Sequence, residues 1–161
     1  MNIQKDVYEW LKMAGIEYQD TFEQRKLGLD LVEEEKEELV LAVLVKDKQG
    51  IIDACVDLFW VVTNNLIFNN ISLEEFEEYA QKVSYSNWSK FCISEDDANA
   101  TVKAYMEGTH PAKPGHQIEC YWKQVGKLYV IYRTVDNKIM KSIYYETPQQ
   151  VNYNNKEDEN S

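Results

Sequence analysis

Two segments with the periodicity of α-helices, residues 22–46 and 51–69, most constrain the fold of this chain, because only the short polar sequence KDKQG separates them. In the first segment the apolar and small positions form one stripe when successive residues turn by about 100°. The second segment is apolar almost all round, which is typical of a helix buried on most sides, often by an oligomer partner. Together the segments predict a helical core.

The run LVEEEKEEL in the first segment sets five glutamates into six consecutive positions. On a helical wheel Glu35 and Glu38 fall inside the apolar stripe and Glu34 lies at its edge, whereas Glu33 and Glu37 fall on the opposite, solvated side. Carboxylates that face a core are unfavourable unless the end of the bundle is open to water, a buried lysine or arginine pairs with them, or a metal ion binds them.

The second segment carries two acids, Asp53 and Asp57, one helical turn apart on one stripe. Pairing the two helices gives these aspartates, Glu35 and Glu38 a common interior pocket. A cluster of carboxylate oxygens suits hard cations, Mg²⁺ above all and also Mn²⁺, which keep waters and bridge to phosphates.

A four-helix di-iron site is the alternative for such a cluster, but it needs Glu-x-x-His pairs. The two histidines of the chain, His110 and His116, lie in a loop beyond the predicted helices. The di-iron alternative is therefore poorly supported by the sequence.

Three further helices complete the helical part. A short one over residues 2–14 stops before Gly15. Ser72 and Ser94 each begin a capping-box pattern, with an acidic residue three positions later, so one helix follows each serine. The last of these helices stops at Gly108.

After residue 109 the sequence becomes rich in tyrosine and β-branched residues, with turn signals around Gly126 and Asn137. This pattern predicts two or three short antiparallel strands. The expected fold is mainly α, with a four-helix-bundle-type core and a small C-terminal antiparallel β appendage. The expected boundaries are residues 1–108 for the helical catalytic core, 109–148 for the β-rich appendage and 149–161 for a disordered acidic tail.

Composition and charge limit the partners. The net charge of −11 argues against binding a nucleic-acid polymer, which needs a basic surface. Three cysteines without a C-x-x-C pair favour a reducing compartment. The N-terminus lacks a signal-peptide pattern. The apolar window 51–68 contains two aspartates and two asparagines and is interpreted as too short and too polar to span a membrane. We therefore expect a cytoplasmic protein without a membrane segment.

The sequence LVEEEKEEL followed by DACVDLFWVV resembles the E-E-x-x-E … E-x-x-D signature of the MazG-like all-α nucleoside triphosphate pyrophosphohydrolases and the related phosphoribosyl-ATP pyrophosphohydrolases. The resemblance places Glu34, Glu35 and Glu38 in the first block and Asp57 at the final acid of the second. Ala54 stands where the family usually has the first acid of the second block. Asp53, one residue earlier, is expected to substitute for it.

A further sequence, VSYSNWSKF, resembles the S-N-x-S-K element of the short phage and bacterial members of this family. The resemblance maps Ser86, Asn87, Ser89 and Lys90 onto groups that contact the phosphates of the substrate. The family often has E-V-x-R before S-N, and this chain differs there. Lys82 is expected to assist in binding phosphate.

The resemblance implies Mg²⁺-dependent hydrolysis of a nucleoside or deoxynucleoside triphosphate between the α and β phosphates, which yields the monophosphate and pyrophosphate. Glu35, Glu38, Asp53 and Asp57 would hold the metal, and Mn²⁺ is a second candidate ion. Either Glu34 or Glu38 would orient or deprotonate the attacking water, so Glu34, Glu35 and Glu38 form the candidate catalytic set. If a phage encodes the chain, its place is the cytoplasm of the host.

The base of the substrate and the oligomeric state are less directly marked. Trp60 is a candidate for stacking on a base and Asn64 for reading its edge, although aromatic residues at helical spacing are more often core. The uncovered apolar faces predict a homodimer or homotetramer. A nucleotide-sensing or interaction protein that keeps the fold with little turnover is the alternative function.

Overall fold

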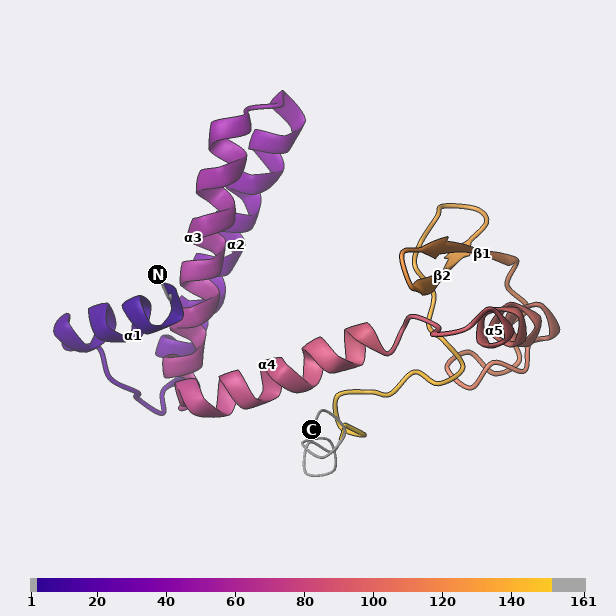
Figure 1. Cartoon of the computed structure of the whole chain (residues 1–161). Coiled ribbons are helices and arrows are strands. Elements are labelled where there is room, and N and C mark those ends of the chain that lie inside the picture. The colour runs from indigo at the N-terminus through magenta and orange to yellow at the C-terminus, as the bar shows by residue number, and fades with distance from the viewer. Residues whose placement is uncertain (1–2, 152–161) are drawn as a thin grey trace. The chain divides into compact units, whose positions relative to one another are not determined.

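The computed structural model describes residues 3–151, which fold into five helices and two strands (Figure 1). Most of the predicted disordered tail lies outside the described residues. The predicted class, mainly α with a small antiparallel β appendage, is confirmed. In chain order the elements are α1 (Ile3–Met13), α2 (Phe22–Val45), α3 (Lys48–Phe68), α4 (Leu73–Trp88), α5 (Glu95–Glu107), β1 (Cys120–Val125) and β2 (Leu128–Arg133).

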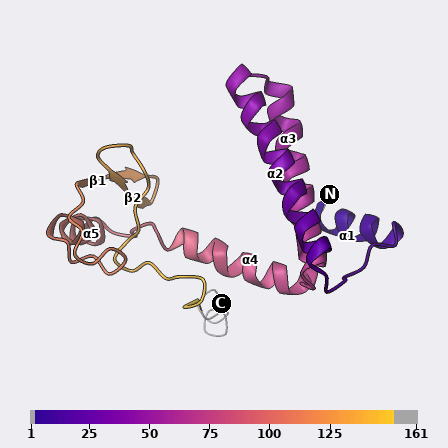
Figure 2. The same ribbon diagram turned by 180° about the vertical axis from the view of Figure 1, so that it is seen from behind.

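The helices α2 and α3 form an antiparallel pair, which Figures 1 and 2 show from opposite sides. The Thr21 hydroxyl caps α2 by accepting from the Gln24 amide at 3.2 Å. Lys46 ends α2 with a left-handed backbone, and the Asp47 carboxylate caps α3 by accepting from the Gln49 amide at 3.1 Å. Because Asp47 acts as an N-cap, α3 begins three residues earlier than the sequence predicted.

Small residues let α2 and α3 approach closely. A side chain at Gly28 would lie 2.3 Å from Asn65 Oδ1, and Asn65 Nδ2 donates to the Gly28 carbonyl at 3.0 Å and to the Val61 carbonyl at 2.9 Å. Near the connection, a side chain at Gly50 would lie 3.3 Å from Ala42 Cβ. Contacts at both ends therefore fix the register of the two helices.

The helix α3 has more apolar surface than its packing covers. It is 21 residues long and, by length and composition alone, apolar enough to cross a membrane. The expectation that this segment is too short and too polar was wrong, because the helix begins at Lys48 and its aspartates are few. A core helix of a soluble protein passes the same test. Ile52, Val56 and Phe59 form an exposed stripe at helical spacing.

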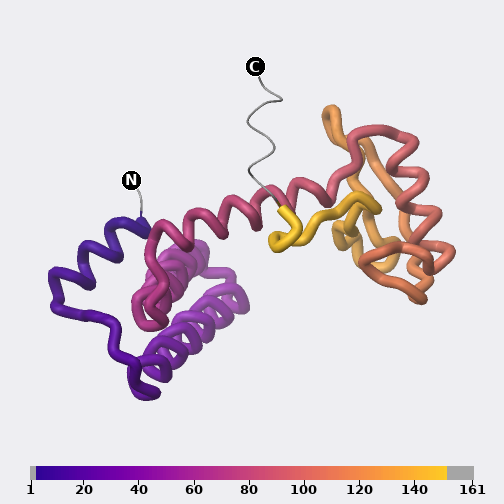
Figure 3. Tube along the Cα trace, turned by 90° about the horizontal axis from the view of Figure 1, so that it is seen from below, coloured from indigo at the N-terminus to yellow at the C-terminus, as the bar shows by residue number. Residues whose placement is uncertain are grey.

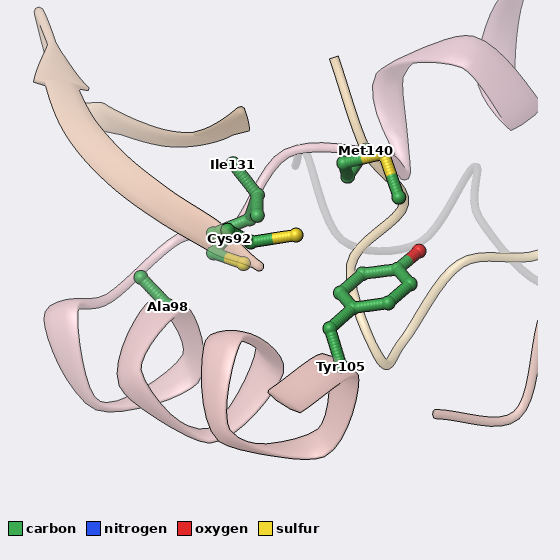
Figure 4. Close-up of a cluster of buried hydrophobic side chains, with 6 residues drawn as sticks. Cys92, Ala98, Tyr105, Ile131 and Met140 are labelled. Carbon is green, nitrogen blue, oxygen red and sulfur yellow. The ribbon is translucent and has the colours of Figure 1, made fainter. Parts of the chain in front are cut away.

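The chain divides into two compact units between residues 78 and 79, within α4. The sequence placed this division between residues 108 and 109. The difference arises because α5 packs on the β hairpin, and it thereby belongs to the second unit. Figure 4 shows their shared core, with the Tyr105 hydroxyl directed toward the segment of Met140. The core cluster comprises Cys92, Ala98, Tyr105, Cys120, Ile131 and Met140.

The β part is a two-stranded hairpin with two isolated bridges beside it. Cys120 pairs with Arg133 and Val125 with Leu128, and Gly126 supplies the positive φ that the tight turn requires. The bridges, Cys92 with Tyr129 and Tyr132 with Ile139, extend the pairing beyond the two strands. They explain why the sequence pattern suggested either two strands or three.

Candidate functional site

Glu35 lies on the seam where α2 packs against α3. Gly28 and Ala42 are buried, and Glu35 is seven residues from each of them, so all three share one heptad position. On α3, buried residues also recur every seven positions, at Ala54, Val61 and Phe68. Glu35 is therefore half-buried at a position that apolar packing would otherwise occupy, as the helical wheel predicted.

Four further acids surround Glu35. Burial raises the pKa of Glu35, and the negative charges of Glu38, Asp57, Glu34 and Asp53 raise it further. These neighbours come from both helices, so α2 and α3 together build the cluster. The structure thus brings together the five acidic residues that the sequence proposed.

The four neighbours of Glu35 are exposed, which corrects the prediction that Glu38 faces the core and the prediction that Asp53 and Asp57 share an interior pocket with it. The wheel defined a stripe wide enough to include Leu27, Glu38 and Val45. In the structure α3 covers only the narrow heptad seam of α2, so residues at the margins of that stripe face outward. The acid cluster has one half-buried member and an open side.

Among residues 3–151, no basic side chain forms an ion pair with an acid of the cluster. Lys36, the lysine within the acid run, pairs with Glu33 on the exposed side of α2. In the described part of the chain, no lysine or arginine forms an ion pair with Glu35. The explanation by a buried salt bridge is therefore not supported for residues 3–151.

The cluster fits a hard cation in donor chemistry and charge, since it offers only carboxylate oxygens. As the side chains lie, however, no three Asp, Glu, His or Cys residues among those described converge closely enough to hold a metal ion. Convergence on one ion would require the exposed side chains to rotate. Glu35, Glu38, Asp53 and Asp57 remain the candidate ligands, and Glu34 the neighbouring acid.

The two candidate base-binding residues lie further along α3. Trp60 is half-buried and packs edge-on against Trp10, with ring centroids 6.0 Å apart and planes at 75°. Asn64 is buried, and its Oδ1 has no hydrogen-bond partner among the described residues. A buried acceptor without a partner is rare in a folded protein, so Asn64 is equipped to accept a hydrogen bond from a ligand or a partner chain.

In the second unit, the serines of SNWSK hold the chain together. The buried Ser86 hydroxyl donates to the Glu146 carbonyl at 2.7 Å. Ser89 Oγ donates to the Ser86 carbonyl at 2.8 Å and accepts from the Glu146 amide at 3.0 Å. Figure 3 shows residues 141–151 in yellow alongside the last turns of α4. Both hydroxyls therefore anchor this segment, which is a different role from the predicted phosphate contact.

The other polar residues of this element are more accessible. Asn87 is exposed near the end of α4, and Lys82 is half-buried on the same helix. The helix α4 ends at Trp88, two residues before Lys90. Lys90 follows in a turn, where its Nζ donates to Asn87 Oδ1 at 2.6 Å. Asn87 and Lys90 are thus adjacent in the structure.

The sequence analysis assigned no role to Lys141 and Tyr145, which lie beside this element. Lys141 Nζ is 3.9 Å from the centroid of the Tyr145 ring, and the Tyr145 hydroxyl is 3.1 Å from Ser86 Oγ. More than fifty residues separate these side chains from SNWSK, so the sequence alone does not place them beside it. Only the tertiary structure brings them together.

Residues 13–83 match the family of phosphoribosyl-ATP pyrophosphohydrolases. An uncharacterized protein of Acanthamoeba polyphaga mimivirus, L479, is 28% identical over 101 residues, which cover 63% of this chain. The matched part is 39% of that protein, so the chain spans well under half of its relative's length. No solved structure matches the chain.

The matched stretch contains α2, α3 and all five acids of the cluster. Four of the acids lie at the positions that the resemblance assigned to them, and Asp53 lies one residue before the usual acid of the family, on two helices that pack against each other. Residues 13–83, less than half of the chain, thus match the phosphoribosyl-ATP pyrophosphohydrolase domain, a family of the MazG-like superfamily of all-α nucleoside triphosphate pyrophosphohydrolases.

Proposed function

We propose that this chain hydrolyses a nucleoside or deoxynucleoside triphosphate between its α and β phosphates, releasing the monophosphate and pyrophosphate. The observation that carries the proposal is the half-buried Glu35, which four acids on two packed helices surround. All five acids lie within residues 13–83, which match the family. The likeness of VSYSNWSKF to the S-N-x-S-K element supports a member of the short phage and bacterial type.

The proposed chemistry assigns a role to each group of residues. A bound Mg²⁺, or Mn²⁺, would offset the triphosphate charge and lower the pKa of a water. Glu35, Glu38, Asp53 and Asp57 would hold the cation, since their mutual repulsion is relieved by a positive charge. Glu34 or Glu38 would orient the water and take its proton.

Outside the acid cluster, Asn87, Lys90 and Lys82 would bind phosphate oxygens. Trp60 and Asn64 are the proposed contacts to the base. The Oδ1 of Asn64 supports this role, because it is buried and lacks a partner among the described residues. A base amino group is a donor of the kind that this atom needs.

The most direct test is a screen of ribo-, deoxyribo- and modified nucleoside triphosphates with Mg²⁺, read out as pyrophosphate and monophosphate. We expect release of pyrophosphate from at least one substrate. Glu38→Gln should abolish it, because the amide removes both a cation ligand and a proton acceptor. Cleavage by Glu38→Gln at the wild-type rate would contradict the assigned role of Glu38.

The alternative is a nucleotide-sensing or interaction protein with little turnover. Its specific support is that the acids do not converge on one point in the described structure. If nucleotides bind in the screen and none is cleaved, this alternative replaces the hydrolase.

We also propose that the chain forms a homodimer or homotetramer through α2 and α3. Ile52, Val56 and Phe59 recur at helical spacing on α3 and are 49%, 45% and 40% exposed, and α2 adds exposed residues such as Leu41 and Leu44. An apolar surface of this kind on a helix pair is typical of an interface with a second copy. Light scattering at micromolar concentration should show an oligomer, and Val56→Asp should shift it toward the monomer. A wild-type monomer would contradict the proposal.

The proposed cellular setting is the cytoplasm, including the cytoplasm of a host cell for a viral member, without a membrane or a nucleic-acid polymer as partner. The net charge of −11 supports the absence of a nucleic-acid partner, because phosphate backbones repel an acidic surface. The three free cysteines support a reducing compartment.

A further inference from the structure

Two lysines far apart in the sequence are held together in the second unit. The Ser142 amide donates to the Lys90 carbonyl at 3.1 Å, which joins the turn after α4 to the segment that carries Lys141. Ser86 and Ser89 extend this connection through their hydrogen bonds to Glu146. The backbones of Lys90 and Lys141 are therefore fixed relative to each other.

The backbone of Lys141 is also held from the core side. Its amide donates to the Tyr105 hydroxyl at 3.3 Å, and its carbonyl lies 3.0 Å from His110 Nε2. Tyr105 and His110 are buried and stacked, with ring centroids 3.8 Å apart. Because His110 Nδ1 accepts from the Ala112 amide, Nε2 carries the proton and donates to Lys141. The point from which the Lys141 side chain leaves the backbone is thus well defined.

The positive charges of both lysines lower the pKa of one phenol, that of Tyr145. Lys141 Nζ lies over the Tyr145 ring, and the buried Ser86 lies 3.1 Å from the Tyr145 hydroxyl. The pKa of Tyr145 is lowered by the hydrogen bond with Ser86 and by the positive charges of Lys141 and Lys90. The region is therefore locally electropositive.

Among the described residues, no acid is paired with these two lysines. Within residues 3–151, neither Lys90 nor Lys141 forms an ion pair with a carboxylate. The chain has 28 acidic and 17 basic residues, so carboxylates are abundant. Two lysines whose backbones are joined, and which have no acid partner within residues 3–151, provide the charge that an anionic ligand needs.

We propose that Lys90, Lys141 and Tyr145, together with Asn87, form a binding site for an oligophosphate chain. The identification of the ligand as a triphosphate or pyrophosphate rests on the proposed function, which supplies both as substrate group and product. Lysine ammonium groups bind phosphate oxygens as point charges, and the phenol and the amide donate hydrogen bonds to them.

The site adds residues that the family match does not contain. Residues 13–83 are matched, whereas all four residues of the proposed site come later in the chain. Two of them, Lys141 and Tyr145, follow the β hairpin. The role of the β-rich segment would then be to carry and position the phosphate-binding lysine, in addition to packing on α5.

The test is calorimetric titration of the full chain with inorganic triphosphate in buffer without divalent metal. We expect saturable binding that Lys141→Gln weakens at least about tenfold and Lys141→Arg largely preserves, since the charge is the essential property. Lys138→Gln is the matched control, because it removes an exposed positive charge three residues away. It should change the affinity by less than about twofold. Thermal unfolding of each variant reports whether its fold is intact.

The outcomes separate this inference from the proposed function. If the wild type does not bind triphosphate, or if Lys141→Gln and Lys138→Gln weaken binding equally, the phosphate site is wrong, whether or not nucleotides are cleaved. If Lys141→Gln alone loses binding while the wild type cleaves no nucleotide, the site stands and the hydrolase proposal fails. In an active enzyme, the same variant should raise KM for the nucleotide more than it lowers kcat.

Discussion

The α2–α3 pair and the second unit, called the C-terminal unit below, differ in whether their polar side chains have hydrogen-bond partners. In the C-terminal unit, buried Thr101 donates to the Asp97 carbonyl at 2.7 Å, and His110 has hydrogen-bond partners at both ring nitrogens. In the α2–α3 pair, Glu35 lies on the packing seam among like charges and Asn64 Oδ1 has no partner within the described residues. The first arrangement stabilises a fold by itself, whereas the second is completed only by a ligand or a partner.

The largest expected effect comes from Glu35→Gln. It should lower kcat/KM by at least about 100-fold, because a cation ligand is lost. It should also raise the unfolding temperature in metal-free buffer, because the amide removes a charge that burial and four nearby acids disfavour. Activity assays and thermal melts measure both. The control, Glu37→Gln, removes a charge from the exposed side and should change neither. A less stable, active Glu35→Gln protein would contradict this account.

His110→Ala tests the contribution of a buried, hydrogen-bonded side chain to the stability of the C-terminal unit. Loss of the stacked ring and of the hydrogen bond to the Lys141 carbonyl should destabilise the C-terminal unit by about 2–4 kcal/mol. Chemical denaturation followed by tryptophan fluorescence measures this loss. His116→Ala is the matched control, since His116 is exposed, and it should cost less than about 0.5 kcal/mol. Equal effects of the two substitutions would show that His110 is not a central support.

Gly28→Ala probes the close packing of α2 on α3. The added methyl group would lie 2.3 Å from Asn65 Oδ1 and 2.9 Å from the Phe68 ring. We expect destabilisation by about 1–3 kcal/mol, although alanine favours a helix more than glycine does. Glu37→Ala, at an exposed position of the same helix, should have little effect in the same denaturation experiment. A more stable Gly28→Ala protein would mean that the helices do not approach this closely.

The smallest effects are opposite pH dependences. The pKa of Glu35 is raised in the folded state, so its contribution favours folding below the ordinary value of 4.5 and is lost as the pH rises through the folded pKa. The pKa of His110 is lowered, mainly by burial, so its contribution is complete above 6.5 and falls as the pH drops below that value. As the pH rises, the free energy of unfolding of Glu35→Gln should increase relative to that of the wild type. That of His110→Gln should decrease relative to the wild type. Parallel curves for both variants would contradict these assignments.

Local sequence signals predicted the local structure well. The reciprocal bonds between Ser72 and Glu75, at 2.8 and 3.1 Å, confirm the capping box before α4. The wheel identified Glu35 correctly, because its position depends only on the helical period and on one packing partner. Glu38 was misplaced because the width of the covered stripe depends on how much of α2 the neighbouring helix covers.

Long-range features were beyond sequence reasoning. The pairing of α5 with the β hairpin moved the division of the chain to residues 78 and 79, since helix boundaries do not reveal packing partners. Ser86 and Ser89 were expected to bind phosphate, but the segment around Glu146 occupies their hydroxyls. The position of Lys141 beside SNWSK appears only in the tertiary structure. Each of these features depends on contacts between residues far apart in the chain.

The central claim is that the acids of α2 and α3 form one cation site, and Mn²⁺ binding tests it most directly. Calorimetric or electron paramagnetic resonance titration of the metal-free protein should show saturable Mn²⁺ binding that Mg²⁺ displaces. Asp57→Asn should weaken this binding at least about tenfold, because the variant removes one carboxylate of the cluster. Absence of binding to the wild type, or equal binding by Asp57→Asn, would contradict the claim.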